Sequence, residues 1–255
     1  MKLAILQSDT AGFTPQQRLA RLEEEAQNTD ADLLLCPELF LSGYAVPDQF
    51  AALAEPASGP SAKRVARIAH ATGTAIAYGF AEAAEDQLFN AMQVIAPDGT
   101  TLARHRKSVL PPGFEPRCFT PGTGNATFTY QSLRIALLIC YEIEFPEAAR
   151  NAALNGADLI LAPTALGAQW GVVAHKLVPT RAFENGIFIA YANHAGREGE
   201  IEYLGESCIV DPMGNDLARA GATAEVICAK IDPTQVAAAR KRLPYLQDRA
   251  GLIRA

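Results

Sequence analysis

Short apolar runs alternate with amphipathic segments along the chain, and this alternation constrains the fold more than any other feature. Apolar runs typical of strands occupy residues 3–7, 31–38, 74–80, 132–140, 157–165 and 186–193. Segments with helical periodicity lie between them, at residues 15–28, 61–73, 146–156 and 172–185. Strands that are apolar on both faces need helices or a second sheet to cover them. The pattern therefore predicts an α/β domain built in layers.

Two turn signatures interrupt this alternation. Pro97-Asp98-Gly99 separates two strand-like runs and predicts a hairpin. An Asp-Pro-x-Gly turn at residues 211–214 predicts a second hairpin, whose return strand is expected within residues 217–231. Ser61 and Gly73 are predicted to cap the two ends of the helix at residues 61–73. No linker or low-complexity tract divides the chain, so residues 1–255 are expected to form one domain.

The composition narrows the class of protein. Apolar residues make up 49% of the chain, enough for a large buried core. The net charge of −6 does not favour binding to nucleic acid or to an anionic membrane, and no apolar run approaches the roughly 20 residues that span a bilayer. The five cysteines are widely spaced and form no C-x-x-C pair, as expected for free thiols in a reducing compartment. We therefore expect a cytoplasmic protein.

Three residues with chemical potential each end a predicted strand. Glu38 follows "LLLCP", Lys107 closes "TLARHRK", and Cys140 closes "RIALLI". Taken singly, a cysteine there is typical of core packing, and a glutamate or lysine of a solvated surface. Functional groups also gather where strands run out into loops, because the sheet fixes them while the loop admits a ligand.

As a set, these residues describe a nucleophilic site. A thiol has a pKa near 8.5 and needs a base to become a nucleophile. The four histidines lie in unpromising contexts, whereas Glu38 can act as the base if burial or a second carboxylate raises its pKa. Lys107 and the backbone N–H after Cys140 could stabilise the oxyanion of a tetrahedral intermediate.

The same stretches carry a family resemblance. "LLLCPELFLSGY", the lysine of "RHRK" and "LLICYEIEFPEAAR" resemble the three signatures of the nitrilase, or carbon–nitrogen hydrolase, superfamily. The resemblance covers nearly the whole chain. It implies a four-layer α-β-β-α sandwich in which Glu38 is the general base, Lys107 the oxyanion stabiliser and Cys140 the nucleophile. It also implies that no metal or organic cofactor is needed.

Further positions follow from this resemblance. "GFEPRCF" offers Glu115 as the accessory glutamate, which would hydrogen-bond the lysine and raise the pKa of Glu38. Glu142 and Glu144 are expected to make structural hydrogen bonds rather than to transfer protons. Arg181 matches a position that ties the periphery of the site together, although a plain salt bridge is an equal alternative.

The substrate class follows from finer features. True nitrilases usually carry tryptophan after the cysteine, whereas this chain has Tyr141, which favours amidases or carbamoyl hydrolases. "ICYEIEFPE", "IEYLGES" and "LPYLQD" resemble the aliphatic amidase branch, so an amidase of that branch is expected. The substrate would be a short aliphatic primary amide, with ω-amino amides included. Alternatives are an N-carbamoyl amine or amino-acid hydrolase, a nitrilase and an inactive scaffold. The candidate pocket residues, each of which could equally be core packing, are Tyr44, Tyr141, Phe145, Ala165 and Trp170.

Two further segments bear on the shape of the pocket mouth and on assembly. Relatives often read differently after the lysine, whereas this chain reads "SVLPPGFEPR", and its proline pair should stiffen the loop at the pocket mouth. The C-terminal "RKRLPYLQDRAGLIRA" resembles a segment that extends across a subunit interface, although a solvated basic tail is an equal alternative. A homodimer or higher homo-oligomer is expected.

Overall fold

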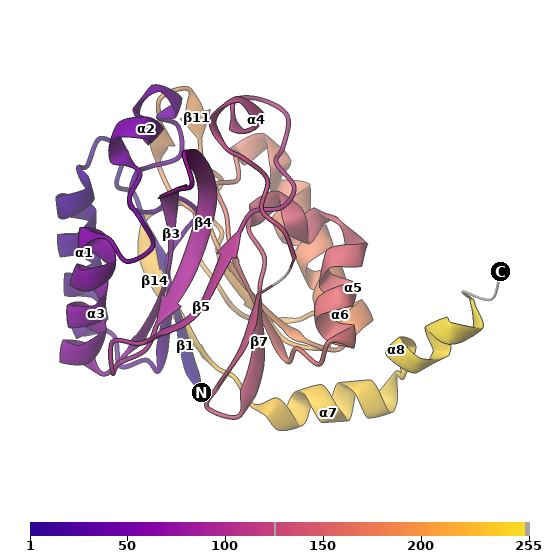
Figure 1. The fold of residues 1–255 in the computed structure, drawn as a ribbon. Helices are drawn as coiled ribbons and strands as arrows, with labels where there is room; N and C mark the ends of the chain where they lie inside the picture. The colour runs from indigo at the N-terminus through magenta and orange to yellow at the C-terminus, as the bar shows by residue number, and fades with distance from the viewer. Residues whose placement is uncertain (125, 253–255) are drawn as a thin grey trace.

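Two six-stranded sheets lie face to face in the computed structural model, which describes residues 1–124 and 126–252 (Figure 1). The first sheet has the order β14-β1-β2-β3-β4-β5, from β1 (Lys2–Gln7), β2 (Leu33–Leu35), β3 (Ala75–Ala84), β4 (Gln87–Ile95), β5 (Thr101–Arg106) and β14 (Glu225–Lys230). The second has the order β13-β12-β9-β8-β7-β6, from β6 (Thr127–Tyr130), β7 (Leu133–Leu137), β8 (Leu159–Pro163), β9 (Phe188–Ala192), β12 (Cys208–Val210) and β13 (Asp216–Arg219). A small hairpin joins β10 (Arg197–Glu198) to β11 (Ile201–Glu202).

Helices cover the outer face of each sheet (Figure 1). The first sheet is covered by α1 (Pro15–Asn28) and α3 (Pro60–Thr72). The second is covered by α5 (Pro146–Leu154) and α6 (Val178–Asn185), the latter entered through a π-helical turn, η4 (Val173–Leu177). The remaining helices are α2 (Phe50–Leu53), α4 (Glu115–Cys118), α7 (Pro233–Arg242), α8 (Tyr245–Asp248) and the 3-10 helices η1 (Pro47–Gln49), η2 (Cys140–Glu144), η3 (Ala168–Trp170) and η5 (Arg249–Gly251).

The alternation of side chains along β1 shows why the strands are apolar throughout. Leu3 and Ile5 point into the core between the two sheets, whereas Ala4 and Leu6 pack under the helices α1 and α3. Both sets are buried, so neither face of the strand tolerates the polar alternation of a surface sheet. The predicted layered α/β architecture is therefore confirmed.

Local signals fixed several element ends. The predicted helix at residues 15–28 matches α1, and a capping box between Thr14 and Gln17 explains its start. The prediction of Ser61 as an N-cap is wrong, because the helix begins at Pro60 and the N-cap is Gly59. Ser61 lies inside the first turn and donates its hydroxyl to Glu55 instead.

The prediction of the second hairpin and its return strand is only partly right. The turn at residues 211–214 does join two antiparallel strands, β12 and β13. The following strand, β14, leaves that sheet and pairs antiparallel with β1 in the other one, with Leu3 opposite Ala229. A hairpin between β3 and β4 was not predicted, because its turn residues, Glu85 and Asp86, lack glycine although both have positive φ.

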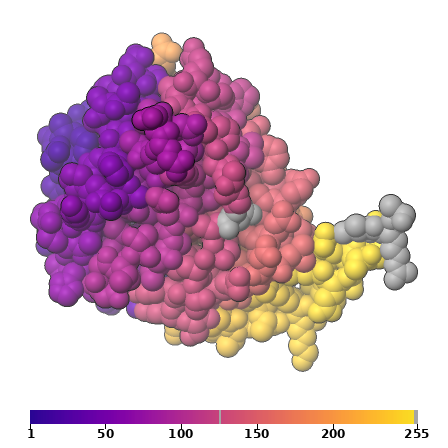
Figure 2. Space-filling model, viewed as in Figure 1, coloured from indigo at the N-terminus to yellow at the C-terminus, as the bar shows by residue number. Residues whose placement is uncertain are grey.

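The C-terminal segment projects from the body of the molecule (Figure 2). Helix α7 runs along the lower edge in the view of Figure 1, and α8 continues outward from it. None of the helices in the described ranges has the length and apolar character that crossing a membrane requires.

Candidate active site

Three strand ends bring the predicted residues to one place. Glu38 and Lys107 follow β2 and β5, which run in the same direction because β4 lies antiparallel to both β3 and β5. The two side chains therefore emerge at the same edge of the first sheet. Cys140 follows β7 in the facing sheet and begins the 3-10 helix η2. The two sheets pack face to face, and this packing brings together residues that are far apart in the sequence.

Lys107 joins two buried carboxylates. Its Nζ donates to Glu38 Oε1 and to Glu115 Oε1, both over 2.7 Å. All three residues are at most 1% exposed. We call these three residues the charged cluster. Because charges this deeply buried are stable only when paired, the cluster must be held in its present arrangement by the surrounding fold.

Two polar side chains complete the coordination of the cluster. Asn90 Nδ2 donates to Glu38 Oε1 over 2.7 Å and to Glu115 Oε2 over 3.3 Å. The Tyr44 hydroxyl donates to Glu115 Oε1 over 2.7 Å. Tyr44 was predicted from the sequence but Asn90 was not, because β4 also carries Gln87 and Gln93 and nothing in the sequence distinguishes its amides. The Oε2 atom of Glu38 has no hydrogen-bond partner among the described residues, so its lone pairs are available.

The cysteine lies beside this cluster in a strained turn. Cys140 has a φ of 49°, in the left-handed region that non-glycine residues rarely adopt, and is 8% exposed. Its Sγ accepts a hydrogen bond of 3.0 Å from the hydroxyl of Thr164, a residue that the sequence analysis did not single out. Thr164 also accepts the backbone N–H of Glu38 on its carbonyl, over 3.4 Å, so it touches both chain segments.

The electrostatics of the site follow from its burial. Burial raises the pKa of Glu38, and the nearby charge of Glu115 raises it further, although Lys107 opposes both effects. Burial alone would lower the pKa of Lys107, but attraction to Glu38, Cys140 and Glu115 outweighs it and raises that pKa. Burial and the Glu38 charge raise the pKa of the Cys140 thiol, against Lys107 and Thr164. The site therefore combines a thiol, a carboxylate whose pKa is displaced towards neutrality, and a fixed ammonium group.

Glu142 fastens the cysteine turn to the strand that carries the lysine. Its Oε2 accepts the backbone N–H of Ile139 over 2.6 Å and Nε2–H of His105 over 2.8 Å. Its Oε1 accepts the backbone N–H of Ser108 over 2.8 Å and the hydroxyl of the same residue. These bonds fit the structural role predicted for Glu142, whereas the hydrogen bond found at Glu144 uses its backbone carbonyl and not its carboxylate. Arg181 donates to the backbone carbonyls of η2 and also pairs with a glutamate of its own helix, so both of its predicted roles occur.

A second carboxylate clamps the loop after β2. Glu198 accepts the backbone N–H groups of Tyr44 and Ala45, over 2.9 and 2.8 Å, and the hydroxyl of Tyr203 over 2.8 Å. Arg18 of α1 completes this arrangement with an ion pair of 3.2 Å to Glu198. We call this arrangement the Glu198 clamp. The clamp fixes the loop that begins at Glu38 and carries Tyr44, whose hydroxyl donates to Glu115.

His194 supports the start of the same loop. Its Nε2 lies 2.7 Å from the backbone carbonyl of Glu38, which can only accept, so this nitrogen carries the proton. Burial lowers the pKa of His194 to about 4. The ring is therefore neutral at pH 7 and acts as a hydrogen-bond donor, not as a general base.

Comparison with known proteins agrees with this geometry. Residues 3–241 match the carbon–nitrogen hydrolase family. The chain belongs to that family. A protein of Pseudomonas protegens named "hydrolase in pqqF 5′ region" is 41% identical over 253 residues, which cover 98% of this chain and 89% of the relative. An (R)-stereoselective amidase of a Pseudomonas species is 34% identical over 221 residues, covering 86% of this chain and 80% of the relative.

A solved structure supports the same conclusion. The amidase from Nesterenkonia sp. superposes with a TM-score of 0.89 at 32% identity, covering 100% of this chain and 95% of that one. The predicted four-layer α-β-β-α sandwich of the nitrilase type is thus confirmed. The chain is an enzyme, a hydrolase of the amidase kind that acts on non-peptide carbon–nitrogen bonds.

The candidate pocket residues of this carbon–nitrogen hydrolase differ in how close they lie to Cys140 and the charged cluster. Ala165 is buried in one apolar cluster with Tyr44, next to the charged cluster. Tyr141 follows the cysteine and packs edge-on against Phe145, with ring centroids 5.0 Å apart. Trp170 is 56% exposed, and no hydrogen bond or ring contact ties it to the cluster in the part of the chain that the structure describes. The structure therefore brings Tyr44 and Ala165 to the site but not Trp170.

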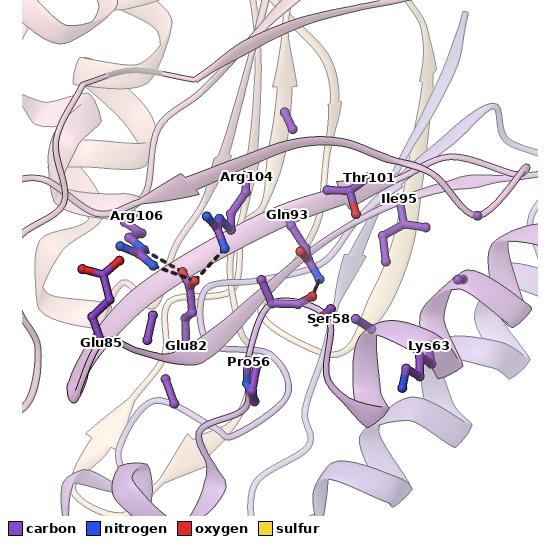
Figure 3. A pocket seen from close by; sticks show the side chains of 17 residues that line it. Pro56, Ser58, Lys63, Glu82, Glu85, Gln93, Ile95, Thr101, Arg104 and Arg106 are labelled. Atoms are coloured by element: carbon purple, nitrogen blue, oxygen red, sulfur yellow. Dashed lines mark hydrogen bonds and ion pairs between the residues drawn. The ribbon is translucent and has the colours of Figure 1, made fainter.

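A large groove of the carbon–nitrogen hydrolase lies elsewhere. It encloses about 830 Å³ between α3 and the strands β3 to β5 (Figure 3). The buried carboxylate of Glu82 there accepts hydrogen bonds from both Arg104 and Arg106, each of 2.8 Å, so its charges are already paired. None of the residues lining this groove belongs to the charged cluster.

Proposed function

We propose that this hydrolase converts short aliphatic primary amides, ω-amino amides included, to carboxylates and ammonia through a cysteine thioester. The observation that carries the proposal is the arrangement around Lys107. Its ammonium group is held by Glu38 and Glu115 beside the sulfur of Cys140, while one oxygen of Glu38 keeps free lone pairs. A nucleophile, a base and an oxyanion stabiliser are thus within one buried site.

Acylation would proceed in two steps. Glu38 takes the thiol proton of Cys140 while the sulfur bonds to the amide carbon and the carbonyl electron pair moves to oxygen. The resulting oxyanion is stabilised by Lys107 and by the backbone N–H of Tyr141. When this intermediate collapses, the carbon–nitrogen bond breaks, and Glu38 returns its proton to the departing ammonia.

Deacylation would repeat these roles with water. Glu38 accepts a proton from water as its oxygen attacks the thioester carbon. The carbon–sulfur bond then breaks, the carboxylic acid is released, and the proton passes from Glu38 back to Cys140. In this scheme Glu115 holds Lys107 in place and raises the pKa of Glu38, so that Glu38 can both accept and donate a proton near neutral pH.

The names of similar proteins support the substrate class. A mutant of the Nesterenkonia amidase has been solved in complex with butyramide, a short primary amide, and another with acrylamide added at its active site cysteine. The tyrosine after the cysteine of this chain favours the amidase branch over nitrilases. An N-carbamoyl substrate is the second candidate, because a Solanum lycopersicum relative named N-carbamoylputrescine amidase is 31% identical over 257 residues, 90% of this chain and 84% of its own.

We also propose that the protein is a cytoplasmic homo-oligomer in which each chain forms one domain over residues 1–255. The five cysteines are all free, which suits a reducing compartment. The C-terminal segment projects from the body and carries exposed apolar side chains, which suits an interface between copies.

The experiment is a substrate panel with a matched pair of variants. Short primary amides, ω-amino amides, N-carbamoyl amino acids and nitriles are incubated with the protein, and released ammonia is measured. Cys140→Ala should abolish release, whereas Cys208→Ala, which removes another buried free cysteine, should retain it. Release from carbamoyl compounds alone would replace the substrate class, and turnover by Cys140→Ala would overturn the mechanism.

A further inference from the structure

The sulfur of Cys140 has a hydroxyl donor that is fixed by the second sheet. Thr164 directly follows β8 and is completely buried. Its backbone N–H donates to the carbonyl of Ala192 over 2.7 Å, which extends the pairing of β8 with β9 by one residue. Its hydroxyl oxygen lies 3.0 Å from Cys140 Sγ and 3.1 Å from the hydroxyl of Tyr191. The ladder therefore fixes the backbone of Thr164, and the buried hydroxyl lies between the sulfur and the tyrosine hydroxyl.

The available hydrogen-bond partners determine the direction of donation among Tyr191, Thr164 and Cys140. Tyr191 is 1% exposed, and among the described residues the hydroxyl of Thr164 is the partner found for its own hydroxyl. When Tyr191 donates to Thr164, the single hydroxyl hydrogen of Thr164 is free to point at the sulfur. The reverse direction would leave the sulfur without this donor, and the thiol hydrogen would then be directed away from the base.

A buried thiolate needs such a donor. Reactive cysteines usually rely on a histidine or on a long helix N-terminus. Among the described residues no histidine bonds to this sulfur, and Cys140 begins only the five-residue 3-10 helix η2. Lys107 is already bonded to two carboxylates, so its charge is shared. The Thr164 hydroxyl and the Ala165 backbone N–H both lower the pKa of the thiol against the effect of burial.

We propose that Thr164 is a catalytic residue that stabilises the thiolate of Cys140, and that Tyr191 is a positioning residue that orients the Thr164 hydroxyl. The inference rests on the proposed role of Cys140 as nucleophile. Negative charge reaches the sulfur twice in that reaction: when Glu38 takes the thiol proton, and when the carbon–sulfur bond breaks and its electron pair returns to sulfur. A fixed donor at the sulfur lowers the barrier of both steps without entering either covalent change.

The test compares a set of substitutions with two readouts. Thr164→Val keeps the shape and removes the donor, Thr164→Ser keeps the donor, and Tyr191→Phe removes only the orienting group. Thr74→Val is the matched control, because Thr74 is also buried but donates to a backbone carbonyl away from the site. The readouts are kcat with KM on a primary amide, and the rate at which iodoacetamide alkylates Cys140 as a function of pH, followed by mass spectrometry of the cysteine peptide.

We expect Thr164→Val to reduce kcat by about 10- to 100-fold with KM changed less than about 3-fold, and to move the pH midpoint of alkylation upward by about one unit. Thr164→Ser should stay within about 3-fold of the native kcat, and Tyr191→Phe should fall between the two. Thr74→Val should match the native protein in both readouts.

Two outcomes would overturn the assignment. Native kcat and a native alkylation profile in Thr164→Val would show that the hydroxyl does not act on the sulfur. An equal loss in Thr164→Ser and Thr164→Val would show that the residue acts through packing. The alkylation profile does not need a substrate, so a shifted midpoint in Thr164→Val supports the assignment even if the panel of amides yields no ammonia and the proposed substrate class fails.

Discussion

Asn90 links the two carboxylates of the charged cluster without adding charge of its own. Its amide donates to Glu38 and Glu115 at once, and its backbone carbonyl accepts the N–H of Lys107 over 2.8 Å. A neutral donor at this position relieves the repulsion between the carboxylates and stabilises the ionised form of Glu38. This single amide therefore helps to set the pH at which the proposed base becomes available.

Replacing this amide with a carboxylate should shift the acid limb of the pH–rate profile. Asn90→Asp adds a third acid beside Glu38, so the pKa of Glu38 should rise and kcat/KM should fall about 10- to 100-fold at pH 7. The loss should shrink as the pH rises, because the base ionises again. Asn151→Asp, on the exposed face of α5, is the control. A loss that does not depend on pH would contradict this account.

At the residue level, sequence reasoning selected Glu38, Lys107 and Cys140 because each ends a predicted strand and matches a signature of the family. It missed Thr164 and Asn90 for a different reason. A threonine after a strand and an asparagine within one are ordinary residues until the tertiary structure is known, since the partner of each hydroxyl or amide lies on a segment distant in sequence.

The loop after β2 works as an element whose shape depends on one close approach. Gly43 has a φ of 84°, and a Cβ there would lie 2.3 Å from Glu198 Oε1 and 2.9 Å from Arg18 Nη2. The Glu198 clamp can close only because this position carries no side chain. The same loop joins Glu38 to Tyr44, so its displacement would reach the charged cluster at both ends.

Gly43→Ala should therefore cost much more than an equivalent change elsewhere. Gly12 has a φ of 74°, and a Cβ added there would meet no atom within 4 Å, so Gly12→Ala reports the backbone strain alone. We expect Gly12→Ala to lower the free energy of unfolding by about 1 kcal/mol with native turnover. Gly43→Ala should lower it by about 3 kcal/mol or more and reduce kcat at least 10-fold. Equal effects of the two substitutions in urea unfolding and turnover would refute the clamp.

At the element level, periodicity predicted what local sequence determines. The helix at residues 15–28 and most strands of both sheets follow from hydrophobic spacing and turn signals, although β6 was not predicted. The destination of β14 does not, because pairing with β1 is decided by the closure of the first sheet and not by the turn that precedes it. The turn at Glu85 and Asp86 was not predicted, because it lacks the glycine that usually marks such a turn.

At the scale of the molecule, the projecting C-terminal segment needs an explanation. Leu252 is 89% exposed and Tyr245 is 39% exposed, although both are large and apolar. Tyr245 also packs edge-on against Phe183 of α6, which holds the start of the segment on the body. A projecting arm with such exposed apolar side chains is stabilised in water when a second copy covers it, which fits the proposed homo-oligomer.

A single charge on this arm should weaken the proposed assembly. Leu252→Asp places a carboxylate where the arm would be buried, and so it should lower the molar mass measured by light scattering at low micromolar protein. Leu217→Asp, at a leucine of β13 that is 39% exposed, is the control and should keep the native mass. The same mass for the native protein and Leu252→Asp would argue that the arm is a solvated tail.

The stability of the whole fold should depend on the protonation of His194. This side chain is buried as the neutral form, with a pKa lowered to about 4 by burial, and donates to the carbonyl of Glu38. In the unfolded chain its pKa returns to about 6.5. Between pH 6.5 and pH 4 the unfolded state therefore binds more protons than the folded state, so the free energy of unfolding must fall as the pH falls through this window.

His194→Gln keeps an amide donor for the Glu38 carbonyl and removes the titration. Between pH 8 and pH 5 the native protein should lose about 2 kcal/mol more of its unfolding free energy than this variant, as measured by urea denaturation at each pH. Other acids titrate in both proteins, so the difference between them isolates the histidine. Parallel losses in the two proteins would mean that the imidazole is not held neutral by the fold, and that the acid sensitivity arises among the carboxylates instead.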